Sequence, residues 1–341
     1  MADGRNLEKV KELAAYRVSE EIYVEEMDSR AMVLEHIKSG ARIFLMSNED
    51  ENKVFYIGFR TPPDDSTGLP HILEHSVLEG SDKFPVKDPF VELVKGSLNT
   101  FLNAMTYPDK TVYPVASCND KDFQNLMDVY LDGVLHPAIY REPKIFLQEG
   151  WHYELESPED ALTINGVVYN EMKGAFSSPE SVLDRFTRNV LFPDTTYSNE
   201  SGGDPAVIPE LTYEKFIAFH RNYYHPANSY IYLYGDMDMA QKLTWLDQEY
   251  LGHYDRKDCH AYSAIAMQQP FEQPVQREIT YSVTEEEGTK DRTYISINTV
   301  VGTDLDPVLY VAFQILEYTL INAPGATLKQ ALIDAGIGQD I

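Results

Sequence analysis

The chain has 341 residues, 43% of them hydrophobic, which is enough to bury a sizeable core and long enough to favour two domains over one. Its formal net charge of -27 argues against a nucleic-acid partner, because phosphate binding requires clustered Lys and Arg, and makes cationic peptides better partners. No apolar run approaches the roughly 18 residues of a membrane span, so we expect no membrane partner. The charged segment 1–20 does not resemble a secretory signal, so we expect a location in the cytoplasm or an organelle matrix.

The chain begins with elements that lead to its most informative motif. A short helix is predicted at 8–15, followed by two strands at 41–47 and 53–59 that a polar turn joins. A helix then begins near residue 69, because capping side chains precede it and Gly80 follows it as a C-terminal stop.

This helix carries the pattern H-x-x-E-H at 71–75. Side chains four residues apart on a helix lie about 6 Å from each other, so His71 and His75 can both bind one ion with bonds of about 2.1 Å. Glu74 stands beside them, where its carboxylate can take a proton from a metal-bound water. The pattern is typical of a hydrolytic zinc site in the inverted order. The alternative is two partly buried histidines that pack on a core helix.

The segment from 88 to 251 alternates helices and strands. The clearest helix lies between Asn119 and Val134, where apolar residues recur at helical spacing. Further helices are predicted at 88–96, from 169 onward, and at 178–191, 212–224 and 237–251, and strands at 98–105, 111–117, 151–156, 166–168 and 229–234.

Composition changes after residue 255. The segment 256–277 is rich in Pro and Gln with little periodicity, which is typical of a linker. Beyond it, strands are predicted at 278–284 and 292–300, and helices at 307–321 and 327–334. We therefore predict a catalytic domain at 1–255, a linker at 256–277, and the beginning of a second, truncated α+β domain at 278–341.

A catalytic zinc usually has three protein ligands and one water, and the helix supplies only two. The cysteines Cys118 and Cys259 lack C-x-x-C spacing, so a thiolate site is not indicated. The third ligand must come from another element, and spacing does not choose among the candidates, which are Glu149, Glu154, Glu156 and Glu171.

Three segments together resemble the pitrilysin/insulinase family of zinc peptidases. They are HILEHSVLEGS at 71–81, LNAMT at 102–106 and VYNEMKG at 168–174. Within the family, the likeness is closest to the branch that contains presequence protease and falcilysin. It is dense from about residue 50 to residue 235 and looser afterward.

The resemblance implies that Glu171 joins His71 and His75 in holding one zinc ion, and that Glu74 is the catalytic base. It also implies that Asn103 and Ala104 line a cleft in which a substrate peptide adds as a strand at a sheet edge. The alternative is that Asn103 is an ordinary strand or turn residue.

The expected fold is α+β, with an antiparallel-rich sheet flanked by helices and the start of a second, similar domain. The expected function is zinc-dependent endopeptidase action on unstructured, presequence-like oligopeptides. The alternatives are a non-catalytic peptide-binding or assembly subunit of the same family and a structural zinc module. Members of the branch are longer, with a second half that closes over the first, so a missing C-terminal half is an expected partner and the chain alone a fragment that can be inactive without it.

Overall fold

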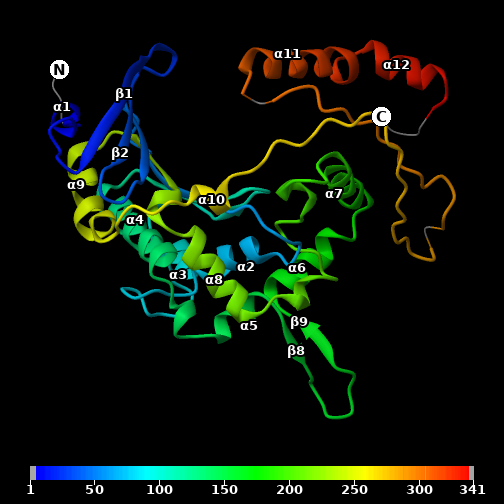
Figure 1. The fold of residues 1–341 in the computed structure, drawn as a ribbon, viewed down its shortest axis with the longest axis horizontal. Helices are drawn as coiled ribbons and strands as arrows, with labels where there is room; N and C mark the ends of the chain where they lie inside the picture. The colour runs from blue at the N-terminus through cyan, green and yellow to red at the C-terminus, as the bar shows by residue number, and fades with distance from the viewer. Residues whose placement is uncertain (1–4, 287, 304, 338–341) are drawn as a thin grey trace. The chain divides into compact units, whose positions relative to one another are not determined.

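The computed structural model describes residues 5–286, 288–303 and 305–337. Its contacts divide the chain into two compact units, Met1–Asp291 and Arg292–Ile341, and Figure 1 labels the helices and some of the strands. The division into a domain at 1–255, a linker and a second domain stays a prediction. None of the helices in the described residues is both long and apolar enough to cross a membrane.

An eight-stranded sheet forms the centre of the first unit. Its strand order is β1-β2-β3-β10-β4-β7-β5, and the short β6 also pairs with β7. Every pair that borders these strands is antiparallel except β3 with β10, which confirms the predicted antiparallel-rich sheet. The strands are β1 (Tyr16–Val24), β2 (Ser29–His36), β3 (Arg42–Ser47), β4 (Lys53–Arg60), β5 (Asn99–Leu102), β6 (Met105–Thr106), β7 (Lys110–Ser117) and β10 (Ser229–Gly235).

The strand β10 lies between β3 and β4, although a polar turn joins those two strands along the chain. Ile231 of β10 aligns with Ile43 on one side and with Ile57 on the other, and all three side chains are buried. A strand from far along the chain therefore completes the centre of the sheet, where its apolar side chains are removed from water.

Helices cover the face of the sheet that carries these buried side chains. The long α4 packs on β7 and β4, and its Asn119 cap accepts hydrogen bonds from the N–H groups of Lys121 and Asp122. Buried side chains of α8 and α9 belong to the same core. The helices are α1 (Leu7–Val10), α2 (Leu69–Ser76), α3 (Pro89–Gly96), α4 (Asp120–Leu135), α5 (Lys144–Glu149), α6 (Val167–Ala175), α7 (Pro179–Leu191), α8 (Tyr213–Tyr223), α9 (Met239–Glu249) and α10 (His260–Ser263).

A two-stranded hairpin of β8 (His152–Glu154) and β9 (Thr163–Asn165) separates α5 from α6 and projects from the body of the unit in Figure 1. The predicted strand at 166–168 is wrong, because Val167 and Val168 begin α6. Their β-branched side chains favour a strand locally, but Val168 is fully buried in the core as part of the helix. The predicted strand at 98–105 is interrupted at Asn103 and Ala104, which separate β5 from β6.

The second unit contains α11 (Pro307–Glu317), a π-helical segment at Tyr318–Asn322 and α12 (Thr327–Asp334), so the two predicted helices are confirmed. The predicted strands at 278–284 and 292–300 are wrong, since neither segment is assigned as a strand. Ile295 and Ile297 are 84% and 95% exposed. An alternating pattern forms a strand only when a neighbouring strand satisfies its backbone groups, and among the described residues from 236 to 337 no strand is assigned.

Candidate metal centre

The helix α2 places both histidines of the H-x-x-E-H pattern at the edge of the core. It follows Gly68, whose φ of +71° lies in the left-handed region, and it has Pro70 in its first turn. The apolar Ile72 and Leu73 are fully buried, which orients the helix about its axis. His71 and His75 consequently lie on the side that α6 approaches.

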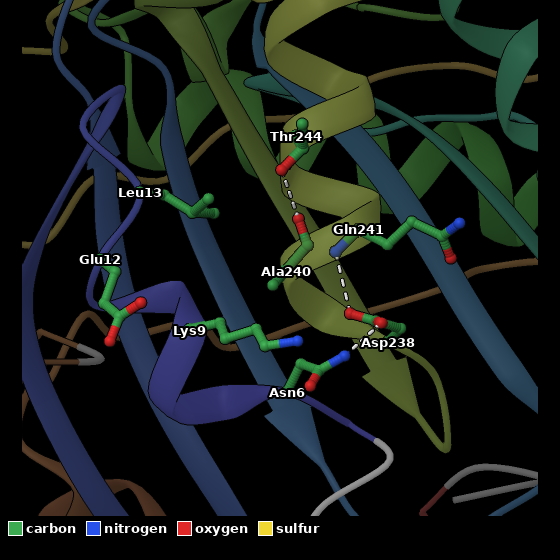
Figure 2. Close-up of a pocket in the computed structure, with 8 residues that line it drawn as sticks. All are labelled: Asn6, Lys9, Glu12, Leu13, Asp238, Ala240, Gln241 and Thr244. Atoms are coloured by element: carbon green, nitrogen blue, oxygen red, sulfur yellow. Dashed lines mark hydrogen bonds between the residues drawn. The ribbon is translucent and has the colours of Figure 1, made fainter.

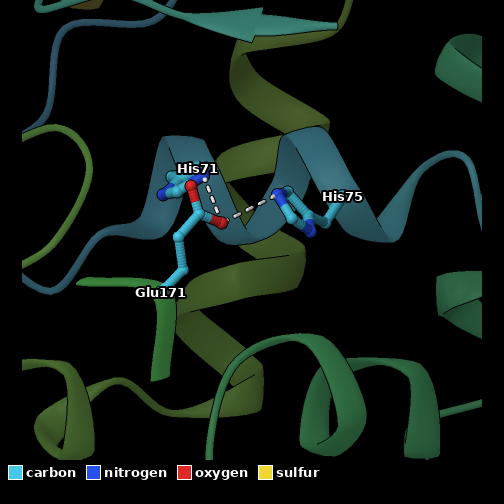
Figure 3. A group of neighbouring side chains, drawn as sticks. All are labelled: His71, His75 and Glu171. Carbon is cyan, nitrogen blue, oxygen red and sulfur yellow. Dashed lines mark ion pairs between the residues drawn. The ribbon is translucent and has the colours of Figure 1, made fainter. Parts of the chain in front are cut away.

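Glu171 of α6 reaches this pair of histidines (Figure 3). Its Oε2 atom lies 3.8 Å from His71 Nε2 and 3.8 Å from His75 Nε2. One ligand atom from each residue lies within 4.8 Å of the others, which makes the three side chains a group that can hold a metal ion. The structure therefore brings together the three residues predicted as ligands.

The two distances from the Glu171 carboxylate to the ring nitrogens fit a small divalent cation. Two ligand atoms bound at about 2.1 Å to one ion are at most about 4.2 Å apart, and about 3.4 Å apart in a regular tetrahedron. The carboxylate of Glu171 lies at 3.8 Å from both ring nitrogens, between these two values. Two imidazoles and one carboxylate are also a donor set that zinc accepts in catalytic sites.

Each histidine is held through its other ring nitrogen. Nδ1 of His71 lies 3.0 Å from the backbone oxygen of Gly202, and Nδ1 of His75 lies 3.2 Å from Oε2 of Glu149. A carbonyl and a carboxylate only accept hydrogen bonds, so each Nδ1 must donate its proton. With the proton on Nδ1, the Nε2 atom of each ring carries a lone pair that faces Glu171. A hydrogen bond from the other ring nitrogen orients histidine ligands in metal sites in the same way.

The charges around the group favour a cation. Burial of the His75 ring opposes protonation, but the hydrogen bond to Glu149 and the charges of Glu74, Glu149 and Glu171 outweigh it and raise the pKa of His75 above its usual range. Glu149 is itself buried and also accepts a hydrogen bond from Gln148 at 2.8 Å. Carboxylates that attract a proton to this position also attract a metal ion.

Glu74 is buried, at 8% exposed, in the same helix as both histidines. Burial, together with the charge of Glu74, raises the pKa of Tyr130 on the facing helix α4. The Tyr130 hydroxyl in turn donates a hydrogen bond to the backbone oxygen of Asn103 at 3.2 Å. The predicted base is therefore close to a residue that holds the predicted substrate-binding segment.

Asn103 and Ala104 form the break between β5 and β6 at the edge of the sheet. The N–H of Asn103 donates to the oxygen of Pro114 in β7, and the N–H of Ala104 donates to the side chain of Asn103. The helix α2 packs against β6. This edge therefore runs beside the helix that carries both histidines, with Asn103 exposed.

The other glutamates that the sequence left open as ligands have different places. Glu149 bonds to the far nitrogen of His75, Glu154 accepts a hydrogen bond from Asn165 within the hairpin, and Glu156 is exposed. Sequence reasoning missed the roles of Gly202 and Glu149 in holding the rings. No spacing rule could have found Gly202, since it lies 131 residues from His71.

A surface hollow of about 380 Å³ lies away from this group, between α1 and α9 (Figure 2). Lys9, Leu13 and Thr244 are among its lining residues, and the side chain of Asn6 donates a hydrogen bond to Asp238 there. None of the residues predicted for the site lines this hollow, so we assign it no part in the chemistry.

Two family models match the chain. The model described as insulinase, peptidase family M16, matches residues 54–149, and the model described as peptidase M16 inactive domain matches residues 210–341. The first segment includes His71, Glu74 and His75, whereas Glu171 lies between the two segments.

Curated relatives extend this similarity. The protein HypA of Clostridium perfringens is 56% identical over 90% of this chain, presequence protease 1 of Arabidopsis thaliana is 46% identical over 97%, and the mitochondrial presequence protease of Mus musculus is 40% identical over 95%. The matched part is 31%, 31% and 32% of these relatives, so the chain spans about a third of their length.

A solved structure gives the same fold. The crystal structure of pitrilysin superposes with a TM-score of 0.56 at 17% identity, over 72% of this chain and 25% of pitrilysin. At this identity the likeness concerns the fold alone, and it agrees with the mixed architecture of a mostly antiparallel sheet and flanking helices. By its family models and its relatives, the chain belongs to the insulinase/pitrilysin family, peptidase family M16.

Proposed function

We propose that this chain carries the zinc-dependent catalytic domain of an endopeptidase that hydrolyses unstructured oligopeptides. The observation that carries the proposal is the convergence of His71 Nε2, His75 Nε2 and Glu171 Oε2. The Nδ1 atom of each histidine ring also donates a hydrogen bond to an acceptor on the opposite side of the ring. The names of the relatives, two of which are presequence proteases, support the same reaction class.

In this proposal His71, His75 and Glu171 would hold a single zinc ion. When bound, zinc would polarise the scissile carbonyl and lower the pKa of the attacking water to about 7. Glu74 would take a proton from the attacking water and pass it to the leaving amine, because it is a buried carboxylate three residues after His71 and one before His75 on the same helix. Glu149 keeps the ring of His75 in the orientation that this arrangement needs.

The substrate would be an extended peptide added at the edge that β5 and β6 form. Asn103 and Ala104 lie where this edge is interrupted beside α2, and an added strand would hydrogen-bond to the backbone of this edge. The net charge of -27 favours basic peptides, such as presequence-like segments. The part of the relatives that this chain does not span would supply the rest of the substrate chamber.

The test uses Glu74→Gln, which removes the proton-accepting carboxylate but keeps the size of the side chain. We expect the variant to bind zinc as the wild type does and to lose about 10²- to 10⁴-fold in the cleavage rate of an unstructured peptide. Metal content is measured by elemental analysis, and cleavage by mass spectrometry of the products.

The matched control is Glu92→Gln, the same change at an exposed position of α3, which should alter neither readout. Both variants are measured in the 341-residue chain and, if its wild type is inactive, in the longer protein. Cleavage by Glu74→Gln at the wild-type rate would contradict the mechanism.

A non-catalytic role is less well supported. The family model described as inactive matches only residues 210–341, and His71, His75 and Glu171 all lie outside that segment. His71, Glu74 and His75 lie instead in the segment 54–149, which matches the family model described as insulinase, peptidase family M16.

A further inference from the structure

We propose that the segment 199–204, which we call the clamp loop, is a positioning element that sets the distance between the two helices carrying the metal ligands. This inference rests on the proposed function, because it concerns the same metal group. The clamp loop contributes no ligand of its own, and it touches both α2 and α6.

The first contact is made with a ligand ring. The backbone oxygen of Gly202 accepts the hydrogen bond from His71 Nδ1 at 3.0 Å. A backbone oxygen moves only with its loop, so the position of the clamp loop fixes the rotation of the His71 ring. A displacement of this loop would turn the Nε2 lone pair of His71 away from Glu171.

The second contact joins the clamp loop to the segment that leads into α2. Asp204 N–H donates to Ser66 O at 2.9 Å, and Glu200 N–H donates to Ser66 Oγ at 3.1 Å. The side chain of Asn199 donates to Pro63 O at 2.9 Å. The segment that leads into α2 is therefore tied to this loop by main-chain and side-chain hydrogen bonds. Because His71 lies in the first turn of α2, these bonds also hold His71 near the loop.

The third contact is a packing of glycines that leaves no space for a side chain. A Cβ atom built on Gly68 would lie 2.8 Å from the oxygen of Gly202 and 2.8 Å from Cα of Gly203. A Cβ atom on Gly203 would lie 2.9 Å from Cα of Gly68, and its φ of +104° is one that side chains rarely adopt. The two backbones approach this closely only because both positions are glycine.

The fourth contact reaches the helix that carries Glu171. A Cβ atom on Gly202 would lie 3.0 Å from Cε of Met172, the residue next to Glu171 in α6. The clamp loop is itself held from α7, because Arg188 pairs with Glu200 at 3.1 Å, and Glu200 also accepts the N–H of Gly202 at 3.2 Å. The loop thus lies against both ligand-bearing helices and is anchored by a third.

The test compares two glycine substitutions that are equally strained but have different neighbours. In Gly203→Ala the new methyl group presses on Ile208 Cδ1 at 2.8 Å and on Cα of Gly68, the residue before α2, at 2.9 Å, whereas in Gly235→Ala it presses on Asp50 O at 3.0 Å and Lys53 Cα at 3.2 Å, with a φ of +112°. Zinc affinity of the full chain is measured by competition with a chromogenic chelator, and stability by thermal unfolding of the zinc-free protein.

We expect both variants to lose stability, but only Gly203→Ala to lose zinc affinity, by about 10- to 100-fold, as other changes to groups that orient metal ligands do. If Gly203→Ala does not fold, Glu200→Ala replaces it, since that change removes the anchor of Gly202 without adding bulk. It should weaken zinc binding in the same direction.

Equal zinc affinities of the wild type and of the folded clamp-loop variant would overturn this inference and leave the proposed function intact. A loss of zinc affinity in Gly235→Ala as large as in Gly203→Ala would also overturn it, because strain alone would then explain the effect. A wild type that does not bind zinc would overturn the proposed function and the inference together.

Discussion

Glu149 is the side chain whose effect on the metal centre can be measured most cleanly. It bonds to Nδ1 of His75 and not to the nitrogen that faces Glu171, so Glu149→Gln should leave the three ligands in place and weaken zinc binding by about 10- to 100-fold. Chelator competition gives the affinity. Glu154→Gln is the control, because the Glu154 carboxylate bonds to Asn165 in the hairpin, and an equal effect of both variants would contradict the role given to Glu149.

The buried ring of His220 makes stability depend on pH. It is 3% exposed, accepts a hydrogen bond from the Tyr140 hydroxyl at 2.6 Å and donates one to Val134 O at 2.9 Å. Burial lowers the pKa of His220 from 6.5 to about 4. Well above pH 6.5, His220 is neutral in both the folded and the unfolded protein, so it does not lower the free energy of unfolding there.

As the pH falls from 6.5 toward 4, the unfolded chain binds a proton at His220 that the folded protein does not bind. The free energy of unfolding should therefore fall by about 3 kcal/mol across this window through His220. Urea unfolding at several pH values measures it. The variant His220→Gln should be less stable at pH 7 but lose less stability on acidification, and an unchanged slope would show that another group is responsible.

At the residue scale, the sequence predicts which residues form the candidate site, but not which groups hold their side chains in place. His71, Glu74 and His75 follow from helical spacing, and Glu171 follows from the resemblance. Gly202 could not be predicted, because what it offers is a backbone oxygen, which every residue has, and its place beside His71 depends on how distant segments pack.

At the scale of elements, the cap of α4 is a local feature whose contribution can be isolated. The side chain of Asn119 accepts from the N–H groups of Lys121 and Asp122. Asn119→Ala should lower the free energy of unfolding by about 1 kcal/mol, because two N–H groups of the first helical turn lose their acceptor. Urea unfolding measures the change, and Lys121→Ala, at an exposed position of the same turn, should have little effect. Equal losses would argue against the cap.

Elements were predictable where the local pattern and the tertiary environment agree. The helix α4 has both a cap and regular apolar spacing, and it is confirmed. The strands β1 and β2 were not predicted, because β1 is largely exposed and lacks a clean alternation of buried and exposed residues. The strand predicted at 166–168 failed for the opposite reason, since its valines fit a strand locally but are used in a buried helix.

At the scale of the whole molecule, the net charge of -27 should affect substrate capture. A basic peptide is attracted from a distance, and this attraction is screened as the Debye length falls from about 10 Å at 0.1 M salt to about 3 Å at 1 M. We expect kcat/KM for a Lys- and Arg-rich peptide to fall over this range more than for a neutral peptide of equal length. Equal salt dependence of the two peptides would contradict steering by charge.

The order of strands in the sheet could not be predicted from the sequence. The polar turn joins β3 and β4 along the chain, but β10 lies between them. Strand patterns report which side chains are buried and not which strands are neighbours, so the central place of β10 is a result of long-range packing. The class of fold, by contrast, follows from the types of elements and from the resemblance.

The most direct test of the metal centre is anomalous X-ray diffraction from crystals of the chain grown with zinc, recorded on both sides of the zinc absorption edge. We predict one anomalous peak bonded to Nε2 of His71, Nε2 of His75 and the carboxylate of Glu171, at about 2.0 to 2.2 Å. A zinc peak elsewhere, with these three side chains unbound, would contradict the central claim.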